Sequence, residues 1–134
     1  MPPGQFTLDE AERLLPRLTD LLAELRARKE EYERFGRQAG ELSLKMRGNG
    51  HVMEGEAKAA QEGLERSLAA VNGLVEQVRE MGCELKDIDQ GLIDFRAEMD
   101  GREVYLCWKL GEERIDWWHE LETGFAGRQP LERM

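Results

Sequence analysis

Three side chains that commonly bind metals lie in the C-terminal third of the chain: Asp94, Cys107 and His119. Carboxylate, thiolate and imidazole groups bind zinc and other divalent transition metals. The same types also form a nucleophile, a base and an orienting carboxylate. Their spacing matches no short ligand motif such as CxxC or HExxH, so hydrogen-bonded packing residues are the simpler interpretation. A metal or catalytic site is the alternative.

A second set of residues has the chemistry of an anion site. It comprises Arg96, Tyr105, Lys109 and Arg128, together with the glycine-containing loop at 124–127. Cationic side chains and loop amides bind anions. Ordinary ion pairing with the many acidic side chains is an equal alternative. The loop is not a P-loop and the chain has no GxGxxG, so no motif supports nucleotide binding.

A predicted β-hairpin places Asp94 opposite Cys107. Sequences of period two at 92–99 and 102–110 flank Asp100-Gly101, a dipeptide typical of two-residue hairpin loops. The resulting register pairs residues of one apolar face, which we expect to be buried: Ile93 with Trp108, Phe95 with Leu106, and Ala97 with Val104. Residues 115–121 alternate and predict a third strand, or one helical turn, that brings His119 nearby.

The residues before the hairpin predict two long helices, at 7–47 and 52–82. In the first, Thr7 and Glu10 form a capping box. Apolar residues at steps of three and four predict a seam like that of a coiled coil. Its members are Leu8, Ala11, Leu15, Leu18, Leu22 and Leu25 in the first helix, and Ala57, Ala60, Leu64, Ser67, Val71, Leu74, Val78 and Met81 in the second. Pro16 predicts a kink.

Glycines mark the ends and contacts of these helices. We expect Gly36 and Gly40 to let the partner helix approach closely, because the apolar pattern continues across them. Gly48-Asn49-Gly50 predicts the turn of the helical hairpin, and Gly82 the end of the second helix. His51, after the turn, would be a third ligand only if the tip folds onto the sheet.

The predicted fold is therefore α+β, a long antiparallel helical hairpin followed by a small antiparallel β-hairpin or meander. A single domain of 1–134 is expected, with the meander at 91–121 and a loop tail at 122–134. Two helices cannot cover all of their leucines, and Leu14, Leu21 and Leu68 would remain on the flanks. These residues must meet the β segment or another copy of the chain, so we expect a homo-oligomer assembled through the helices.

The composition narrows the classes of function. A net charge of −9 argues against broad nucleic-acid binding, which requires a basic surface, and against anionic membranes. The sequence has no apolar run of membrane-spanning length and its N-terminus has no signal-peptide pattern. Cys83 and Cys107 do not form a disulfide framework. A cytoplasmic protein with reduced thiols is therefore expected.

Four phrases of the sequence are distinctive: FTLDEAERLLPRL, LKDIDQGLIDF, DGREVYLCWKLGE and WHELETGFAGRQP. In these phrases, and over nearly the whole chain, the sequence resembles a family of small bacterial proteins known as domain of unknown function 2203. The resemblance implies a cytoplasmic bacterial protein and no particular activity. It also implies proline at the position of Arg96, which argues against a shared role for this arginine. The candidate site residues lie in the matching phrases: Asp94, Cys107, Trp108, His119, Gly124, Gly127 and Arg128.

Two functions follow from these observations. The first is a non-enzymatic oligomeric scaffold, in which the helices assemble and the tail recognises a protein partner. The second is a small-molecule or metal site between the meander and the C-terminal loop. In it, Asp94, Cys107 and His119 would bind a divalent transition metal or act as acid and base, and Arg128 would hold an anion. The sequence does not decide whether the protein is an enzyme.

Overall fold

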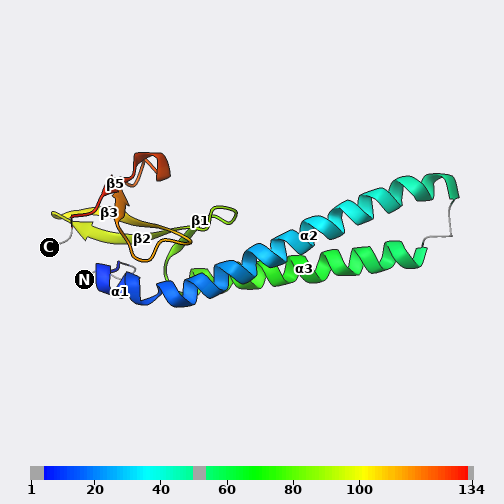
Figure 1. The fold of residues 1–134 in the computed structure, drawn as a ribbon, viewed down its shortest axis with the longest axis horizontal. Coiled ribbons are helices and arrows are strands. Elements are labelled where there is room, and N and C mark those ends of the chain that lie inside the picture. The colour runs from blue at the N-terminus through cyan, green and yellow to red at the C-terminus, as the bar shows by residue number, and fades with distance from the viewer. Residues whose placement is uncertain (1–4, 50–53, 133–134) are drawn as a thin grey trace. The chain divides into compact units, whose positions relative to one another are not determined.

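The computed structural model describes residues 5–49 and 54–132 and confirms the α+β architecture (Figure 1). Three helices come first: α1 (Leu8–Arg13), α2 (Leu15–Asn49) and α3 (Glu54–Glu80). Five strands follow: β1 (Glu84–Asp87), β2 (Leu92–Met99), β3 (Arg102–Lys109), β4 (Trp117–His119) and β5 (Gln129–Pro130). They form one sheet in sequence order, and each strand is antiparallel to the next. A 3₁₀ turn, η2 (Phe125–Gly127), precedes β5.

The chain divides into two compact units. The first comprises residues 1–23 and 75–134, and therefore holds α1, the beginning of α2, the end of α3 and the whole sheet. The second comprises residues 24–74, which are the remaining parts of α2 and α3. All seven candidate site residues belong to the first unit.

The first predicted helix is divided into α1 and α2 at Leu14. The hydroxyl of Thr7 accepts the amide of Glu10 at 3.1 Å, and the Glu10 carboxylate accepts the amide of Thr7 at 2.8 Å. The capping box is thus confirmed. Pro16 has no amide proton, and its ring crowds the preceding turn of a continuous helix. The interruption two residues before this proline confirms the predicted kink.

The predicted helical seam is buried in part. Its buried members are Ala11 of α1, Leu15, Leu18, Leu22 and Leu25 of α2, and Ala60, Ser67, Leu74 and Val78 of α3. Its other predicted members are half-buried: Leu8 of α1, Ala57, Leu64 and Val71 of α3, and Met81 directly after α3. The turn predicted to begin at Gly48 is wrong at that residue, since α2 continues through Asn49. Residues 50–53, which include His51, lie outside the described residues. Gly82 has a φ of 90°, and its amide bonds to Arg79 O at 2.9 Å, which confirms the predicted stop after α3.

In the second unit, the close helix contact is not at the glycines that the sequence indicated. A Cβ atom on Gly36 would lie 3.7 Å from Leu64 Cδ1, an ordinary contact, and one on Gly40 would meet no described atom within 4 Å. The close approach occurs at Gly63 of α3, where a Cβ atom would lie 2.5 Å from the Phe35 ring. The prediction for Gly40 therefore fails, and α2 tolerates this glycine without a packing reason.

The β2–β3 hairpin has the predicted register at every position, including Asp94 opposite Cys107. Asp100 and Gly101 have φ values of 53° and 80°, the left-handed conformations that a tight hairpin loop requires. The six apolar residues of the predicted buried face are all buried: Ile93, Phe95, Ala97, Val104, Leu106 and Trp108.

The N-terminal segment and α1 lie against this apolar face (Figure 1). The Phe6 ring contacts the Phe95 ring edge-on, with 5.3 Å between their centroids. The amide of Phe6 donates to Arg96 O at 2.7 Å. The amide of Ile115, between β3 and β4, donates to Glu12 Oε2 at 2.9 Å. These contacts fix α1 relative to the hairpin.

The opposite side of the sheet, here called the polar face, carries Asp94, Cys107 and His119. It is buried at this end as well, because the tail after β4 lines it with Leu121 and Phe125. The sequence predicted one buried face. It also missed both edge strands: β1 precedes the expected meander, and β5 lies within the expected loop tail of 122–134.

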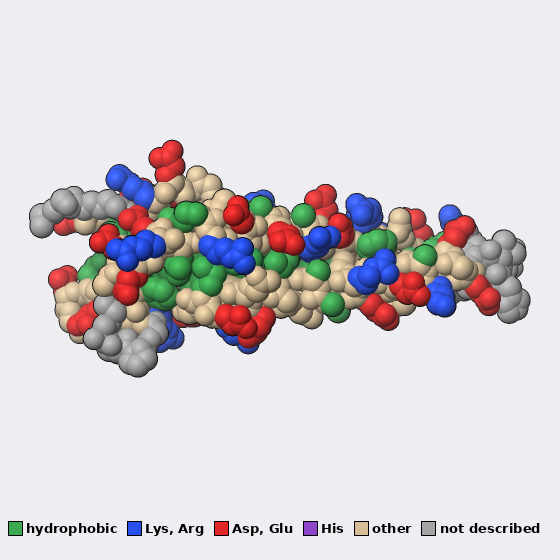
Figure 2. Space-filling model, turned by 90° about the horizontal axis from the view of Figure 1, so that it is seen from below, with side chains coloured by type: hydrophobic (Ala, Val, Ile, Leu, Met, Phe, Trp, Pro, Cys, Tyr) green, Lys and Arg blue, Asp and Glu red, His purple; other side chains and the backbone are tan. Residues whose placement is uncertain are grey.

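No described helix is both long and apolar enough to cross a membrane. On the face drawn in Figure 2, acidic and basic side chains are interspersed, and neither sign gathers into a large patch. Within the described part of α2, charged side chains form pairs one helical turn apart, such as Arg28 with Glu31 at 3.1 Å and Lys29 with Glu33 at 3.8 Å. Such pairs are typical of a solvated helix face.

Candidate metal centre

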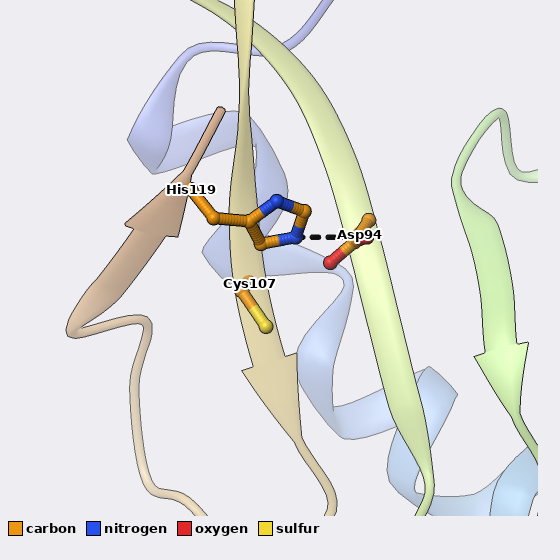
Figure 3. Close-up of side chains that lie close together, drawn as sticks. All are labelled: Asp94, Cys107 and His119. Carbon is orange, nitrogen blue, oxygen red and sulfur yellow. Dashed lines mark hydrogen bonds and ion pairs between the residues drawn. The ribbon is translucent and has the colours of Figure 1, made fainter. Parts of the chain in front are cut away.

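Three strands bring the three predicted ligand residues together (Figure 3). Asp94 lies on β2, Cys107 on β3 and His119 on β4. One ligand atom from each of them, a carboxylate oxygen, Sγ and a ring nitrogen, lies within 4.8 Å of the other two. The side chains of Asp94 and His119 are 4% and 2% exposed, and Cys107 is buried. Within the part of the chain that the structure describes, they form the one such cluster.

The strand registers account for this convergence. Asp94 is the direct cross-strand neighbour of Cys107, so both side chains point to the polar face. β4 pairs with the other edge of β3, with Tyr105 opposite His119 and Cys107 opposite Trp117. His119 therefore shares the polar face. The Tyr105 ring lies against the His119 ring at 5.3 Å between centroids, which restricts the orientation of the imidazole.

The hydrogen bonds of His119 define where its protons lie. Nδ1 is 2.7 Å from Glu120 O, a carbonyl that can only accept, so Nδ1 carries a proton. Nε2 is 3.0 Å from Asp94 Oδ2. One proton must lie between these two atoms, on either the ring or the carboxyl group. Nε2 is therefore the atom that becomes a metal ligand when this proton leaves.

Burial shifts the acid–base properties of the other two residues. Removal from water raises the pKa of Asp94, although the neighbouring His119 opposes the shift. Burial, and next the charge of Asp94, raise the pKa of the Cys107 thiol to about 12. A metal-free Cys107 is therefore protonated at neutral pH.

This arrangement does not fit the nucleophile–base–orienter alternative. In such a set, a histidine nitrogen accepts the proton of the cysteine while the carboxylate holds the other nitrogen. Here both nitrogens of His119 face other groups, the Asp94 carboxyl and a backbone carbonyl. A reactive cysteine also has a lowered pKa, whereas that of Cys107 is raised.

The same geometry fits a divalent metal. Bonds of about 2.0–2.3 Å in a tetrahedral site place ligand atoms roughly 3.4–3.6 Å apart. The Nε2–Oδ2 separation of 3.0 Å is close to this value. The Cys107 sulfur, within 4.8 Å of both, needs a shift of about 1 Å at most to complete the three ligands. The Nδ1–H bond to a backbone carbonyl is the contact that orients most metal-bound histidines.

Arg128 lies next to this cluster and is held on three sides. Its guanidinium group bonds to both Glu112 oxygens, at 2.8 and 3.0 Å, and stacks on the rings of Trp117 and Phe125. Its charge favours the ionised form of Cys107 and so partly opposes the rise in the pKa of that thiol. Its Nε atom is buried without a hydrogen-bond partner among the described residues.

The anion site proposed from the sequence is not assembled. Arg96 bonds to Glu84 and Glu103 instead, at 3.1 and 3.0 Å, and Arg128 to Glu112. Ordinary ion pairing therefore accounts for both arginines.

The other candidate residues have different positions. Trp108 points to the apolar face, where it is buried and its Nε1 donates to Glu112 O at 2.9 Å. Gly124 lines a cavity beside the cluster and has a φ of 64°. Gly127 lies in η2, where a Cβ atom would collide with Thr123, so a larger residue would not fit. Trp108 is thus a core residue, and the two glycines shape the tail.

The cavity beside the cluster has a volume of about 130 Å³. Besides the three ligand residues, its lining includes Lys86, Leu92, Tyr105, Leu121, Gly124 and Phe125. The sequence did not indicate Lys86, because β1 was not predicted. The available signal was weak: Glu84 and Lys86 stand two residues apart, as same-face residues of a strand do.

The chain was compared with known proteins. The family model described as "Uncharacterized conserved protein (DUF2203)" matches residues 5–131. No curated protein and no solved structure gives a significant match. The family match covers nearly the whole chain, including both helices, the sheet and the cluster. The chain therefore belongs to the DUF2203 family of uncharacterized conserved proteins.

Proposed function

We propose that this protein binds a divalent transition metal through Asp94, Cys107 and His119. Zinc is the best match, because it accepts carboxylate, thiolate and imidazole together. The supporting observation is the convergence of three different ligand types from three adjacent strands within 4.8 Å. Asp94 would bind through Oδ2, Cys107 through Sγ and His119 through Nε2.

Electrostatics support the proposal. In the metal-free protein, the buried carboxyl and imidazole groups hold one proton between them. A divalent ion would replace this proton and that of Cys107, and its two charges would be balanced by a carboxylate and a thiolate. The resulting centre would be neutral. A neutral centre is compatible with burial, whereas a separate buried charge is strongly unfavourable.

The test is zinc affinity, measured by competition with a chromophoric chelator. Wild-type protein should bind one ion per chain, and Cys107→Ala should lose most of this affinity because it removes the thiolate. Cys83→Ala is the matched control. Cys83 is also buried, but its Sγ contacts Val78 O at 3.6 Å outside the cluster. Equal zinc affinity of wild-type protein and Cys107→Ala would refute the proposal.

His119→Ala gives an independent test with a different ligand atom. We expect this variant to lose zinc, because Nε2 contributes a metal ligand, and to stay folded, because the apolar face of the sheet is unchanged. If His119→Ala unfolds and no metal binds to the wild-type protein, the cluster is a structural hydrogen-bond network.

Assembly through the helices is a second candidate function. It rests on two leucines of the second unit that are unusually exposed for their size, Leu44 at 66% and Leu68 at 41%. Single exposed leucines are common on protein surfaces, so these two mark an interface only if a partner covers them. We infer that a scaffold role would use the helix surface around these two leucines.

The cysteines bear on the compartment. Cys83 and Cys107 are both buried and unpaired, and we infer that they suit a reducing compartment such as the cytoplasm.

A further inference from the structure

We propose that the metal centre has an open coordination position that takes a small carboxylate from the adjacent cavity, with Lys86 selecting for the negative charge. This inference rests on the proposed metal site and adds the class of ligand that the site receives. It concerns the cavity of about 130 Å³ on the polar face.

The number of protein ligands supports an open position. Zinc sites with four protein ligands are structural, while sites with three keep one position for water or another ligand. The described residues supply three, and each of Asp94, Cys107 and His119 also lines the cavity. A ligand in the cavity would therefore reach an ion held by these side chains directly.

The charge of the cavity favours an anion. Lys86 is the basic residue of the lining, and its charge acts on Asp94, where it partly opposes the rise in the pKa of that carboxyl group that burial causes. Its Nζ lies 3.0 Å from Glu84 Oε1 and 4.8 Å from the centre of the Tyr105 ring. An ammonium group has three donors, so two remain for a ligand. Glu84 is itself shared, since it also binds Arg96 and the Tyr105 hydroxyl.

The walls and size of the cavity limit the ligand to a short molecule with an apolar end. Leu92, Leu121 and Phe125 supply apolar surface, and the last two are 38% and 40% exposed. These two residues of the tail therefore form the mouth through which a ligand can enter. At about 30 Å³ per water-sized group, the volume accommodates roughly four heavy atoms. Acetate, with four heavy atoms, and propionate, with five, are close to this size and combine one charged end with an apolar remainder.

The experiment uses cobalt in place of zinc, since the visible absorption of Co²⁺ depends on its ligands and their geometry. Propionate is then titrated into the Co²⁺-loaded, full-length protein. The absorption bands should shift with saturation, and propionamide, which has the same size without the charge, should cause no shift. Lys86→Met should bind propionate about fivefold to tenfold more weakly, because one partly screened charge is lost. The exposed Lys58, in the second unit, is the control: Lys58→Met should bind like wild type.

The outcomes separate the two proposals. If wild-type protein produces no cobalt–thiolate absorption, the metal site itself is refuted. Cobalt absorption that does not respond to propionate would leave the metal site standing and would overturn the open carboxylate position. A shift with equal affinity in Lys86→Met and wild type would overturn the role of Lys86. An equal response to propionamide would overturn the selection for charge.

Discussion

At the scale of residues, His119 carries the most information about the site. Its Nδ1 is committed to Glu120 O, and its Nε2 points at Asp94. A metal ligand needs such a fixed tautomer, because the ligating nitrogen must be the one without a proton. Cys107 is the third proposed ligand. Its raised pKa means that the thiol is protonated in the metal-free protein, and binding of a metal ion would release this proton.

Arg128 should tune the metal affinity without binding the ion. Its charge favours the thiolate of Cys107. Arg128→Gln should therefore weaken zinc binding about tenfold, the smallest loss that is usual when a residue in contact with a metal ligand is replaced. Arg114→Gln is the control, because Arg114 pairs with Asp116 at 2.9 Å on the surface. Chelator competition measures both variants. Equal affinities for the two would show that Arg128 serves only the tail.

Because of Cys83, the free energy of unfolding of the protein should fall as the pH rises into the alkaline range. Burial raises the pKa of its thiol to about 11, above the value of an exposed thiol, so the folded state holds the proton more tightly. The stability gained in this way is complete below pH 9 and is lost as the pH rises from 9 through about 11. In this interval, the loss approaches about 1.4 kcal/mol per pH unit.

Urea denaturation of the wild-type and Cys83→Ala proteins at pH 8 to 11 measures this effect. The wild-type protein should lose its advantage over the variant as the pH rises. Parallel curves for the two proteins across the range would contradict the assignment to Cys83.

At the scale of elements, α3 offers a matched pair of glycines. At Gly73, a Cβ atom would meet no described atom within 4 Å, so Gly73→Ala should stabilise the helix by about 0.5–1 kcal/mol. At Gly63, the same change collides with the Phe35 ring and should destabilise by about 1–3 kcal/mol. Thermal unfolding followed by circular dichroism decides the signs. Stabilisation by Gly63→Ala would show that Phe35 moves aside freely.

The β-hairpin was predictable because two local signals agree. Asp100-Gly101 fixes the loop, and the alternation on both sides fixes which residues share a face, so the pairing of Asp94 with Cys107 followed. The convergence of His119 was less certain, because β4 has three residues and its sequence fits a helical turn as well.

The missed elements lack such local signals. β1 is short and mostly charged, and its pairing is interrupted by an irregularity between Leu85 and Asp87. β5 consists of Gln129 and Pro130, a pair that forms a strand only because β4 presents a free edge. The cavity depends on both the β1 residue Lys86 and the folded tail. It could not be derived from periodicity, which says nothing about distant segments.

At the scale of the whole molecule, the expected assembly is tested at exposed leucines and not in the buried helical seam. Leu18→Asp would bury a charge at a fully buried position, and should therefore unfold the first unit whether or not the protein assembles. Leu44 and Leu68 are exposed, so Leu44→Asp with Leu68→Asp should preserve the fold.

Light scattering after size-exclusion chromatography then reports the mass of the assembly. We expect an oligomer for wild type and monomers for the double variant, with unchanged circular dichroism. A wild-type monomer at all concentrations would exclude assembly through the helices, and an unchanged oligomer in the double variant would exclude this surface.

Native mass spectrometry of untagged protein, purified without chelator, tests most directly whether Asp94, Cys107 and His119 bind a metal ion. We expect an added mass of one divalent ion per chain, which Cys107→Ala loses and Cys83→Ala retains. The same spectra report the number of subunits. A wild-type chain that carries no ion, even after incubation with zinc or cobalt, would contradict the account. Asp94, Cys107 and His119 would then be a hydrogen-bond network that stabilises the polar face of the sheet.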